Sequence, residues 1–434
     1  MEPQCDISLP GLDTDPHPVL ARLREQAPVC WVPQLGGWLV TGYDAAVAVL
    51  AAPDTFTVDD PRFTTARVTG PSMLSRDGAE HARHRNPFNH AYKPAQLQER
   101  LAEFTAAEAR RLAGAIEPEG HAELREAVAG PLAAAVMTEA LGLHGIGVTP
   151  ATVLAWYRDI VTAVAELPPA AGDTGNPDGG GGAVDVASFG ALAEKLRAAM
   201  AAGTAPLLAG AAGGSTGEGS TGEDGGAASA GGAGTGSGPV ALTVGEVVSN
   251  AAVMLFGGIE TTEGMICNVL AHVLSEHGPA GPGRSHRGGS RVGDGNDGAF
   301  GDIGVEAVDE SLRLEPAAAV VDRYATRDVT LGGAGIRRGD LVTVSLAGAN
   351  RDPALFPDPD SFNPSRPNAH RHLSFARGPH FYIGAHLARL ETLTAVNTLL
   401  ARLPGLRLDG TPRVRGLVFR KPRELQAAWG LPSA

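Results

Sequence analysis

The residues from Thr243 to His277 constrain the fold most, because they form the longest stretch of the chain with apolar residues at helical spacing. Thr243 and Glu246 have the spacing of a capping box at its start. A helix of about 35 residues is about 50 Å long and would cross a whole domain. Gly257 and Gly258 lie side by side in its middle. Because glycine weakens a helix interior, the pair indicates either a close approach to a ligand or a packing defect.

The segment from Phe375 to Glu391 gives the second constraint. It reads Phe-Ala-Arg-Gly-Pro-His-Phe-Tyr-Ile-Gly-Ala-His-Leu-Ala-Arg-Leu-Glu. A loop with glycines, followed by a run rich in Ala, Leu and Arg, predicts a loop that leads into a helix N-terminus. Gly378 and Gly384 allow the backbone to turn tightly and to approach something flat, and Tyr382 lies between them.

This segment resembles the haem-binding loop of cytochromes P450, which has the pattern Phe-x-x-Gly-x-x-x-Cys-x-Gly followed by Leu-Ala. The residues that match are Phe375, Gly378, Gly384, Leu387 and Ala388. Tyr382 stands where the family has the cysteine that ligates the haem iron. The glycine pair with Ile259, Glu260 and Thr261 resembles the oxygen-activation signature of the same family. The resemblance implies that Glu260 and Thr261 relay protons to oxygen.

Several basic residues also match positions of this family. His81 and Arg85 are four residues apart and share a helix face, which is typical of either a solvated basic surface or an anion site. P450s carry His-x-x-x-Arg here, followed by an aromatic residue and a proline, as in Tyr92 and Pro94. The resemblance implies that the haem propionates are held by His81, Arg85, Arg323 and His380.

A third motif implied by the resemblance is structural. Glu310 and Arg313 alone are weak evidence, because ion pairs at this spacing are common on helix surfaces. In this order they resemble the Glu-x-x-Arg motif of P450s, with Arg366 as the third member. Guanidinium groups pair bidentately with a carboxylate, so we expect the three side chains to meet.

The composition excludes several classes of protein. The net charge is −13 with no basic cluster, which argues against nucleic acid as a partner. Met1–Pro10 has neither the positively charged region nor the apolar region of a signal sequence, and no apolar run has membrane-spanning length, so we expect no membrane partner. Three cysteines form neither a disulfide framework nor a metal cluster, which favours a cytoplasmic location.

The resemblance predicts one P450-like domain over residues 1–434: mostly α with a small β part, a triangular helical prism around a long central helix. The strands are expected near residues 29–41 and 328–346, and residues 56–75 as a loop. Three glycine-rich insertions, at about residues 172–182, 209–238 and 277–304, are too poor in apolar residues to pack and are expected to be flexible. The third replaces a helix that P450s normally have.

Three interpretations of Tyr382 follow. In the first, its phenolate ligates haem b in an oxidoreductase of secondary metabolism, monooxygenase or peroxidase-like, with a small-molecule substrate and a ferredoxin-type redox partner. Without the thiolate, which favours O–O cleavage, ordinary P450 monooxygenation is not expected. In the second, the iron has no protein ligand at this position, or the chain is a haem-free scaffold that activates a partner enzyme such as a glycosyltransferase. In the third, it is inactive. Four cationic or dipolar groups around an empty cavity would be costly, which favours haem.

Overall fold

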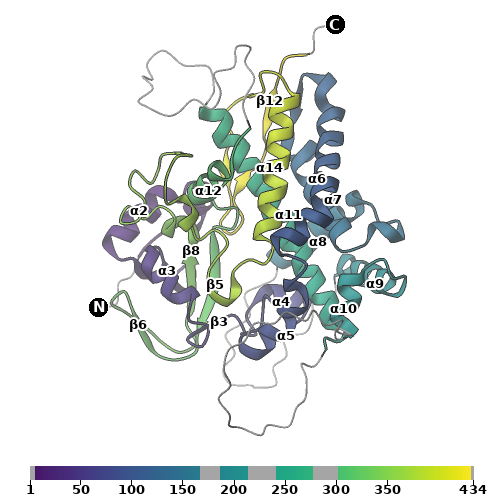
Figure 1. The fold of residues 1–434 in the computed structure, drawn as a ribbon. Helices are drawn as coiled ribbons and strands as arrows, with labels where there is room; N and C mark the ends of the chain where they lie inside the picture. The colour runs from purple at the N-terminus through teal and green to yellow at the C-terminus, as the bar shows by residue number, and fades with distance from the viewer. Residues whose placement is uncertain (1–4, 167–185, 214–240, 277–301, 432–434) are drawn as a thin grey trace, which may run out of the picture.

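The computed structural model describes residues 5–166, 186–213, 241–276 and 302–431, and these residues form a mostly helical fold (Figure 1). The helices are α1 (Leu9–Thr14), α2 (His17–Gln26), α3 (Tyr43–Leu50), α4 (Thr64–Thr69), α5 (Gly78–Asn89), α6 (Pro94–Ile116), α7 (Gly130–Ala140), α8 (Pro150–Glu166), α9 (Ala187–Ala201), α10 (Pro206–Gly213), α11 (Val244–Glu276), α12 (Val305–Leu314), α13 (Leu346–Ala349) and α14 (Ala385–Arg402). The strands are β1 (Val29–Val32), β2 (Gly37–Val40), β3 (Phe56–Thr57), β4 (His121–Glu123), β5 (Val320–Ala325), β6 (Val329–Leu331), β7 (Ala334–Ile336), β8 (Leu341–Ser345), β9 (Arg407–Leu408), β10 (Val414–Arg415), β11 (Lys421–Pro422) and β12 (Gln426–Ala428). The predicted fold class, mostly α with a small β part, is confirmed.

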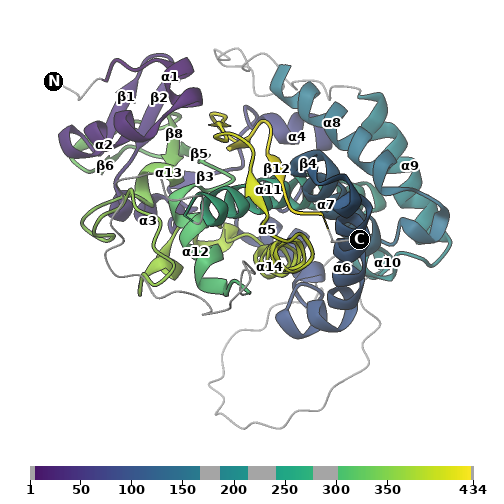
Figure 2. The same cartoon turned by 90° about the horizontal axis from the view of Figure 1, so that it is seen from above.

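Helix α11 is the central element, with 33 residues, and α7, α12 and α14 pack against it. Seen from above, the largest sheet lies on one side of α11 with α2 and α3, and α6 to α10 lie on the other (Figure 2). The predicted capping box is present: the Glu246 amide donates to Thr243 Oγ1 at 3.3 Å, and Glu246 Oε2 accepts from the Thr243 amide at 2.8 Å. Because the apolar periodicity is local, this helix was predictable from sequence.

The largest sheet has the strand order β1-β2-β8-β5-β3. Only the β2–β8 pairing in this sheet is parallel, with Trp38 opposite Val342. A second sheet has the order β4-β12-β9, and β6–β7 and β10–β11 form two-stranded pairs. Strand β5, which carries Arg323, lies between β8 and β3 in this sheet.

The Glu310 carboxylate lies between two guanidinium groups in the interior. Arg313 Nε and Nη2 donate to it at 2.8 and 2.9 Å, and Arg366 Nε donates at 3.0 Å. Glu310 and Arg313 are completely buried. The remaining guanidinium hydrogens donate to backbone carbonyls between residues 350 and 361. The three side chains therefore join α12 to the irregular segment that precedes the predicted haem loop.

Two sequence predictions of local structure were wrong. Residues 56–75 are not all loop: Phe56 pairs with Ala325 in β3, and residues 64–69 form α4, which packs on α8. Tertiary pairing overrides the weak local preference here. Residues 209–213, assigned to a flexible insertion, form the end of α10, where Leu208 and Ala211 are buried. The predicted flexible segments 172–182, 214–238 and 277–301 lie outside the described residues.

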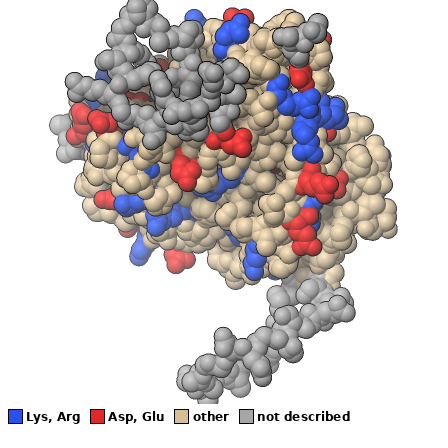
Figure 3. Space-filling model, turned by 45° about the horizontal axis from the view of Figure 1, so that its top comes forward, with Lys and Arg blue, Asp and Glu red and all other residues tan. Residues whose placement is uncertain are grey.

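The surface shows no strong separation of charge on the face in Figure 3, where basic and acidic side chains lie interspersed. In the described part of the chain, no helix is both long and apolar enough to cross a membrane. No group of three or more His, Cys, Asp or Glu residues that could hold a metal ion occurs among the described residues.

Candidate functional site

A cavity of about 490 Å³ lies between α11, strand β5 and the predicted haem loop. Most of its wall is apolar, including Val253, Phe256, Val320 and Phe375. Arg85, Arg323 and His380 also line it, so the same cavity has cationic side chains and an extended apolar surface. It can therefore bind a mainly apolar molecule that carries negative charge.

The loop that precedes α14 is built by close backbone contacts. Gly378 has φ +72°, and a Cβ there would lie 2.6 Å from the Leu50 carbonyl oxygen, so only glycine fits. The Tyr382 amide donates to the Phe375 carbonyl at 2.9 Å, which closes the loop. The rings of Phe375 and Tyr382 stack with centroids 6.0 Å apart. Gly384 has an ordinary φ of −82°, so its role is different.

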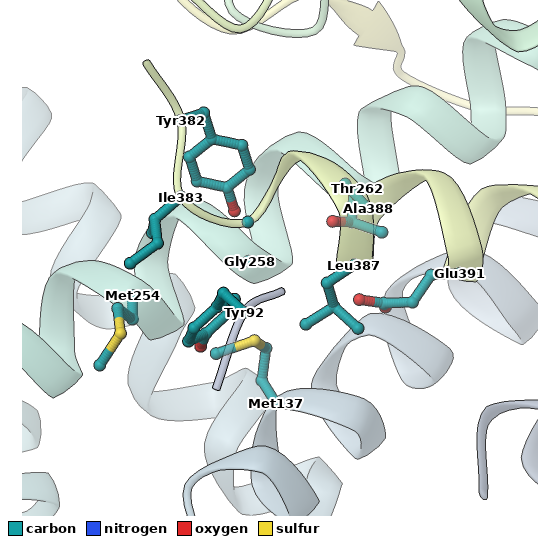
Figure 4. Close-up of a pocket in the computed structure, with 11 residues that line it drawn as sticks. Tyr92, Met137, Met254, Gly258, Thr262, Tyr382, Ile383, Leu387, Ala388 and Glu391 are labelled. Atoms are coloured by element: carbon teal, nitrogen blue, oxygen red, sulfur yellow. The ribbon is translucent and has the colours of Figure 1, made fainter. Parts of the chain in front are cut away.

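The Tyr382 ring crosses from the loop to α11 (Figure 4). A Cβ on Gly384 would lie 2.7 Å from the phenol oxygen, and one on Gly257 would lie 3.4 Å from Cε2 of the ring. Gly384 is therefore needed to make room for Tyr382 itself. Burial raises the pKa of the Tyr382 phenol, Tyr92 and Glu391 raise it further, and a hydrogen bond with Thr261 opposes them. The phenol is neutral at pH 7.

Two basic residues at the cavity have no acidic partner within ion-pair distance in the described residues. Arg323 is almost fully buried, and its Nη1 donates a hydrogen bond to the Asp322 carbonyl at 2.7 Å. Burial lowers its pKa to about 10, although Asp77 and Asp322 oppose the shift. Arg85 donates to the carbonyls of Pro379 and Phe381 at 3.2 and 2.7 Å, and burial lowers its pKa too.

The two predicted propionate histidines lie together, with ring centroids 4.4 Å apart. His81 is buried, and its Nε2 has no hydrogen-bond partner among the described residues. Burial, followed by His380 and Arg85, lowers the His81 pKa to about 4, so this ring is neutral at pH 7. His380 differs, because its Nε2 lies 2.7 Å from Asp77 Oδ1.

Asp77 is a site residue that the sequence analysis missed. Burial opposes its ionisation, but hydrogen bonds from His380, Thr57 and the Val58 amide together lower its pKa to about 2. The signal that could have found it is its place directly before α5, which is a typical N-cap position. Asp77 makes no capping bond there, so its carboxylate is available to His380.

The two glycines of α11 have different roles, and the helix continues through both. Gly257 faces Tyr382, whereas a Cβ on Gly258 would lie 2.4 Å from Met137 Sδ of α7. The sequence left open whether the glycine pair allows the close approach of a ligand or reflects packing. Gly258 allows α7 to pack closely on α11, and Gly257 makes room beside the cavity. Thr261 lines the cavity and donates to the Gly257 carbonyl at 2.5 Å.

Glu260 lies outside the cavity wall and forms an ion pair with Lys421 of β11 at 2.9 Å. Burial raises the pKa of Glu260, and Lys421 opposes the shift. Lys421 also pairs with Glu263 at 2.5 Å. The sequence analysis missed Lys421, because no local pattern links residues so far apart along the chain.

Comparison with known proteins agrees with this fold. The family model "Cytochrome P450" matches residues 305–404. The chain is 32% identical over 424 residues to "Cytochrome P450 monooxygenase PikC" of Streptomyces venezuelae, covering 94% of this chain and 89% of that protein. The chain belongs to the cytochrome P450 family.

Other relatives share parts of the sequence or the fold. A "20-oxo-5-O-mycaminosyltylactone 23-monooxygenase" of Streptomyces fradiae is 36% identical over 193 residues, which are 44% of this chain and 42% of that protein. The structure of cytochrome P450 CYP109Q5 from Chondromyces apiculatus superposes with a TM-score of 0.75 at 23% identity, covering 99% of both chains. This structural likeness shows the fold.

A haem fits one part of the site and not another. Buried Arg323, Arg85 and the unpartnered His81 Nε2 suit the two carboxylates of a haem. The apolar walls suit its ring. Between the loop and α11, however, the Tyr382 ring occupies the space that a haem ligated from this loop would need. In the conformation described, the carboxylate end of the site fits a haem and the centre does not.

Proposed function

We propose that this protein is a haem-dependent oxidoreductase of the P450 family, acting on a small molecule, in which the Tyr382 phenolate replaces the thiolate. The carrying observation is the buried Arg323 guanidinium, which faces an apolar cavity with no carboxylate at ion-pair distance in the described residues. A buried charge is costly without a partner, so the cavity calls for an anionic ligand. When bound, haem supplies the redox chemistry.

The proposal requires a movement of Tyr382. Its ring must turn away from Gly257 to leave room for a haem, because the ring now reaches α11. Loss of the phenol proton is opposed by burial, so a bound ferric iron would have to supply the stabilisation of the phenolate. Tyrosine is a known haem ligand type, used in catalase.

The residues of α11 have separable roles in this proposal. Thr261 is the member of the acid–alcohol pair that lines the cavity, so its hydroxyl is the group that can contact a substrate or oxygen. Glu260 lies behind it, outside the cavity wall, and would act through it; burial raises the pKa of Glu260 and so favours its protonated form, whereas Lys421 opposes this shift. The apolar wall at Phe63, Val161 and Phe419 favours a mainly apolar substrate. The names of the monooxygenase relatives support the reaction class. In this proposal a ferredoxin-type partner supplies the electrons.

The test is the absorption spectrum and haem content of the purified protein, before and after reconstitution with haem. We expect a high-spin ferric spectrum of phenolate type, and a ferrous CO complex without the thiolate signature. Tyr382→Phe keeps the ring and removes the ligand atom, so it should shift the ferric spectrum. Tyr382→Cys tests whether a thiolate can replace the phenolate.

Arg323→Gln tests the carboxylate end independently. Loss of a hydrogen bond to a charged group costs about 1.5–3 kcal/mol, so haem affinity should fall about ten- to hundredfold. The phenolate-type absorption band of the ferric protein should stay at the same wavelength. Arg111→Gln is the matched control, because Arg111 lies on α6 with its side chain 63% exposed. Wild-type protein that takes up no haem after reconstitution would end the haem proposal.

The position of the Tyr382 ring supports a second candidate, the haem-free scaffold that binds and activates a partner such as a glycosyltransferase. A ring that already closes the space between the loop and α11 would stabilise the fold without a cofactor. For this candidate we expect no haem uptake, full thermal stability without haem, and recovery of a glycosyltransferase in a pull-down with the wild-type protein. Tight haem binding would rule it out.

A further inference from the structure

Two carboxylates of the central helix α11 meet the same ammonium group. Glu260 and Glu263 are three residues apart, so their side chains lie on one face of the helix. Lys421 Nζ of β11 lies 2.9 Å from Glu260 Oε1 and 2.5 Å from Glu263 Oε2. Both glutamates are deeply buried, with exposed fractions of 7% and 4%. One lysine therefore stands between two buried carboxylates.

The position of Lys421 is fixed by the backbone of its strand. The preceding residue, Arg420, donates to Glu315 at 2.7 Å, and the side-chain amide of Asn268 donates to the Arg420 carbonyl at 3.1 Å. A Cβ on Gly264 of α11 would lie 3.6 Å from Cβ of Lys421, so β11 packs closely on the helix. Because the strand is held in this way, Lys421 cannot move freely toward either carboxylate. The two glutamates therefore compete for its charge.

Glu263 is better supplied with positive charge than Glu260. Glu263 Oε1 lies 3.5 Å from Arg125 Nη1, which belongs to the π-helical turn Arg125–Ala129 before α7. Lys421 also lies closer to Glu263 than to Glu260. Among the described residues, Lys421 is the one cation within ion-pair distance of Glu260. The acid next to Thr261 is thus the one with less positive charge around it.

This arrangement favours a proton on Glu260 rather than on Glu263. Burial raises the pKa of Glu260, Lys421 opposes the shift, and the negative charge of Glu263 adds to it. An opposite charge within about 4–6 Å lowers a carboxyl pKa by about 1–3 units, whereas a like charge raises it. Two carboxylates that interact strongly titrate as a pair. The member with less positive charge around it takes up the proton first.

The charged groups that act on Glu260 come from three elements: Glu263 of α11, Lys421 of β11 and Arg125 of the π-helical turn. Glu123 of β4 and Cys267 of α11 also lie near this cluster. The Glu123 carboxylate accepts hydrogen bonds from three backbone amides at 2.6–3.2 Å. Burial raises the pKa of the Cys267 thiol, so the thiol is neutral. Neither residue brings a further cation to the two glutamates.

We propose that Glu263 is a positioning residue of this site, which competes with Glu260 for Lys421 and so determines how readily Glu260 takes up and releases a proton. The described wall of the cavity does not include Glu263, so it acts through Lys421 and Glu260. Its effect on the proton affinity of Glu260 does not depend on haem. That this proton serves a reaction at Thr261 rests on the proposed function.

The test is a pH titration of the haem-free protein by infrared difference spectroscopy from pH 4 to 9. The carboxylic-acid C=O band of Glu260 is the band that is lost in Glu260→Gln, and its midpoint gives the pKa of Glu260 in the folded protein. Glu263→Gln leaves Lys421 to Glu260 alone, so the midpoint should fall by about one unit or more. Lys421→Met removes the cation, so the midpoint should rise by about 1–3 units.

The matched control is Glu126→Gln. Glu126 also pairs with Arg125, at 3.1 Å, but its side chain is 61% exposed, so the Glu260 midpoint should stay at the wild-type value. A midpoint that stays unmoved or rises in Glu263→Gln would overturn the proposal, because a merely structural Glu263 would not lower it. A Glu260 without a carboxylic-acid band in this pH range would overturn it too. If Lys421→Met does not fold, Glu263→Gln still decides, since it preserves the side-chain volume.

In haem-loaded protein that turns over a substrate, Glu263→Gln should also shift the limb of the pH profile that reports Glu260 to lower pH. The infrared titration needs neither haem nor substrate. Failure of the haem proposal and failure of the role of Glu263 are therefore distinguishable.

Discussion

Tyr382 and Gly257 are in contact distance across the centre of the site: a Cβ on Gly257 would lie 3.4 Å from Cε2 of the Tyr382 ring. One residue comes from the loop before α14 and the other from the middle of α11. The two positions therefore determine together how much space remains between loop and helix. Any ligand that enters this space must first displace the ring.

The adjacent glycines of α11 should respond differently to alanine. At Gly257 the added methyl meets the ring at an ordinary contact distance, so the better helix propensity of alanine should leave stability unchanged or raise it by up to about 1 kcal/mol. At Gly258 the methyl would lie 2.4 Å from Met137 Sδ, so we expect a loss of about 1–3 kcal/mol. Denaturant unfolding of both variants measures the difference. Equal stabilities would contradict the assigned packing of α7 on α11.

Glu310→Gln should be strongly destabilising, by about 3–5 kcal/mol, because it leaves Arg313 and Arg366 buried without a counter-ion. Circular dichroism during thermal unfolding measures the effect. Glu108→Gln is the control, since it breaks a pair of the same spacing with the exposed Arg111 and should cost less than about 1 kcal/mol. Similar losses of stability in both variants would show that the ion pairs of Glu310 with Arg313 and Arg366 do not stabilise the fold more than a surface pair does.

The buried Glu391 predicts a pH dependence of stability. Its pKa is raised in the folded protein, so the folded state holds a proton that the unfolded state releases. Stability should therefore fall as the pH rises from the unfolded pKa of about 4.5 toward the folded pKa, by up to about 1.4 kcal/mol per pH unit. Glu391→Gln removes this contribution. The difference in unfolding free energy between wild type and variant, measured from pH 4 to 8, should change with pH in this sense; a flat difference would contradict it.

Asp77 should have the opposite pH dependence, because its folded pKa is lowered to about 2. Its contribution to stability is present above the unfolded pKa of about 3.8 and is lost as the pH falls through about 2. Asp77→Asn should therefore cost about 2 kcal/mol at pH 7 and little at pH 2. It should also leave His380 without its acidic partner. Asp59→Asn, at a more exposed pair with Arg76, is the comparison that should change little.

The parts of the fold that depend on local patterns could be predicted from the sequence. Helix α11 and its capping box follow from periodicity and from the Thr243–Glu246 spacing. The pairing of Lys421 with Glu260 could not be predicted, since nothing near either residue specifies the other. The direction of the Tyr382 ring could not be predicted either, because it depends on Gly257 of α11 and on Gly384, which precedes α14. Strand β3 exists only through its pairing with β5, so residues 56–57 gave no signal on their own.

The ion pair of Glu260 with Lys421 has a consequence for the order of events during synthesis. Glu260 belongs to the central helix, and its described ion-pair partner lies in β11, much later in the chain. At a translation rate of about 5–20 residues per second, the ribosome adds the intervening residues in roughly ten to thirty seconds. During that interval Glu260 of α11 lacks the positive charge of Lys421. The centre of the molecule can therefore close only when almost the whole chain has been made.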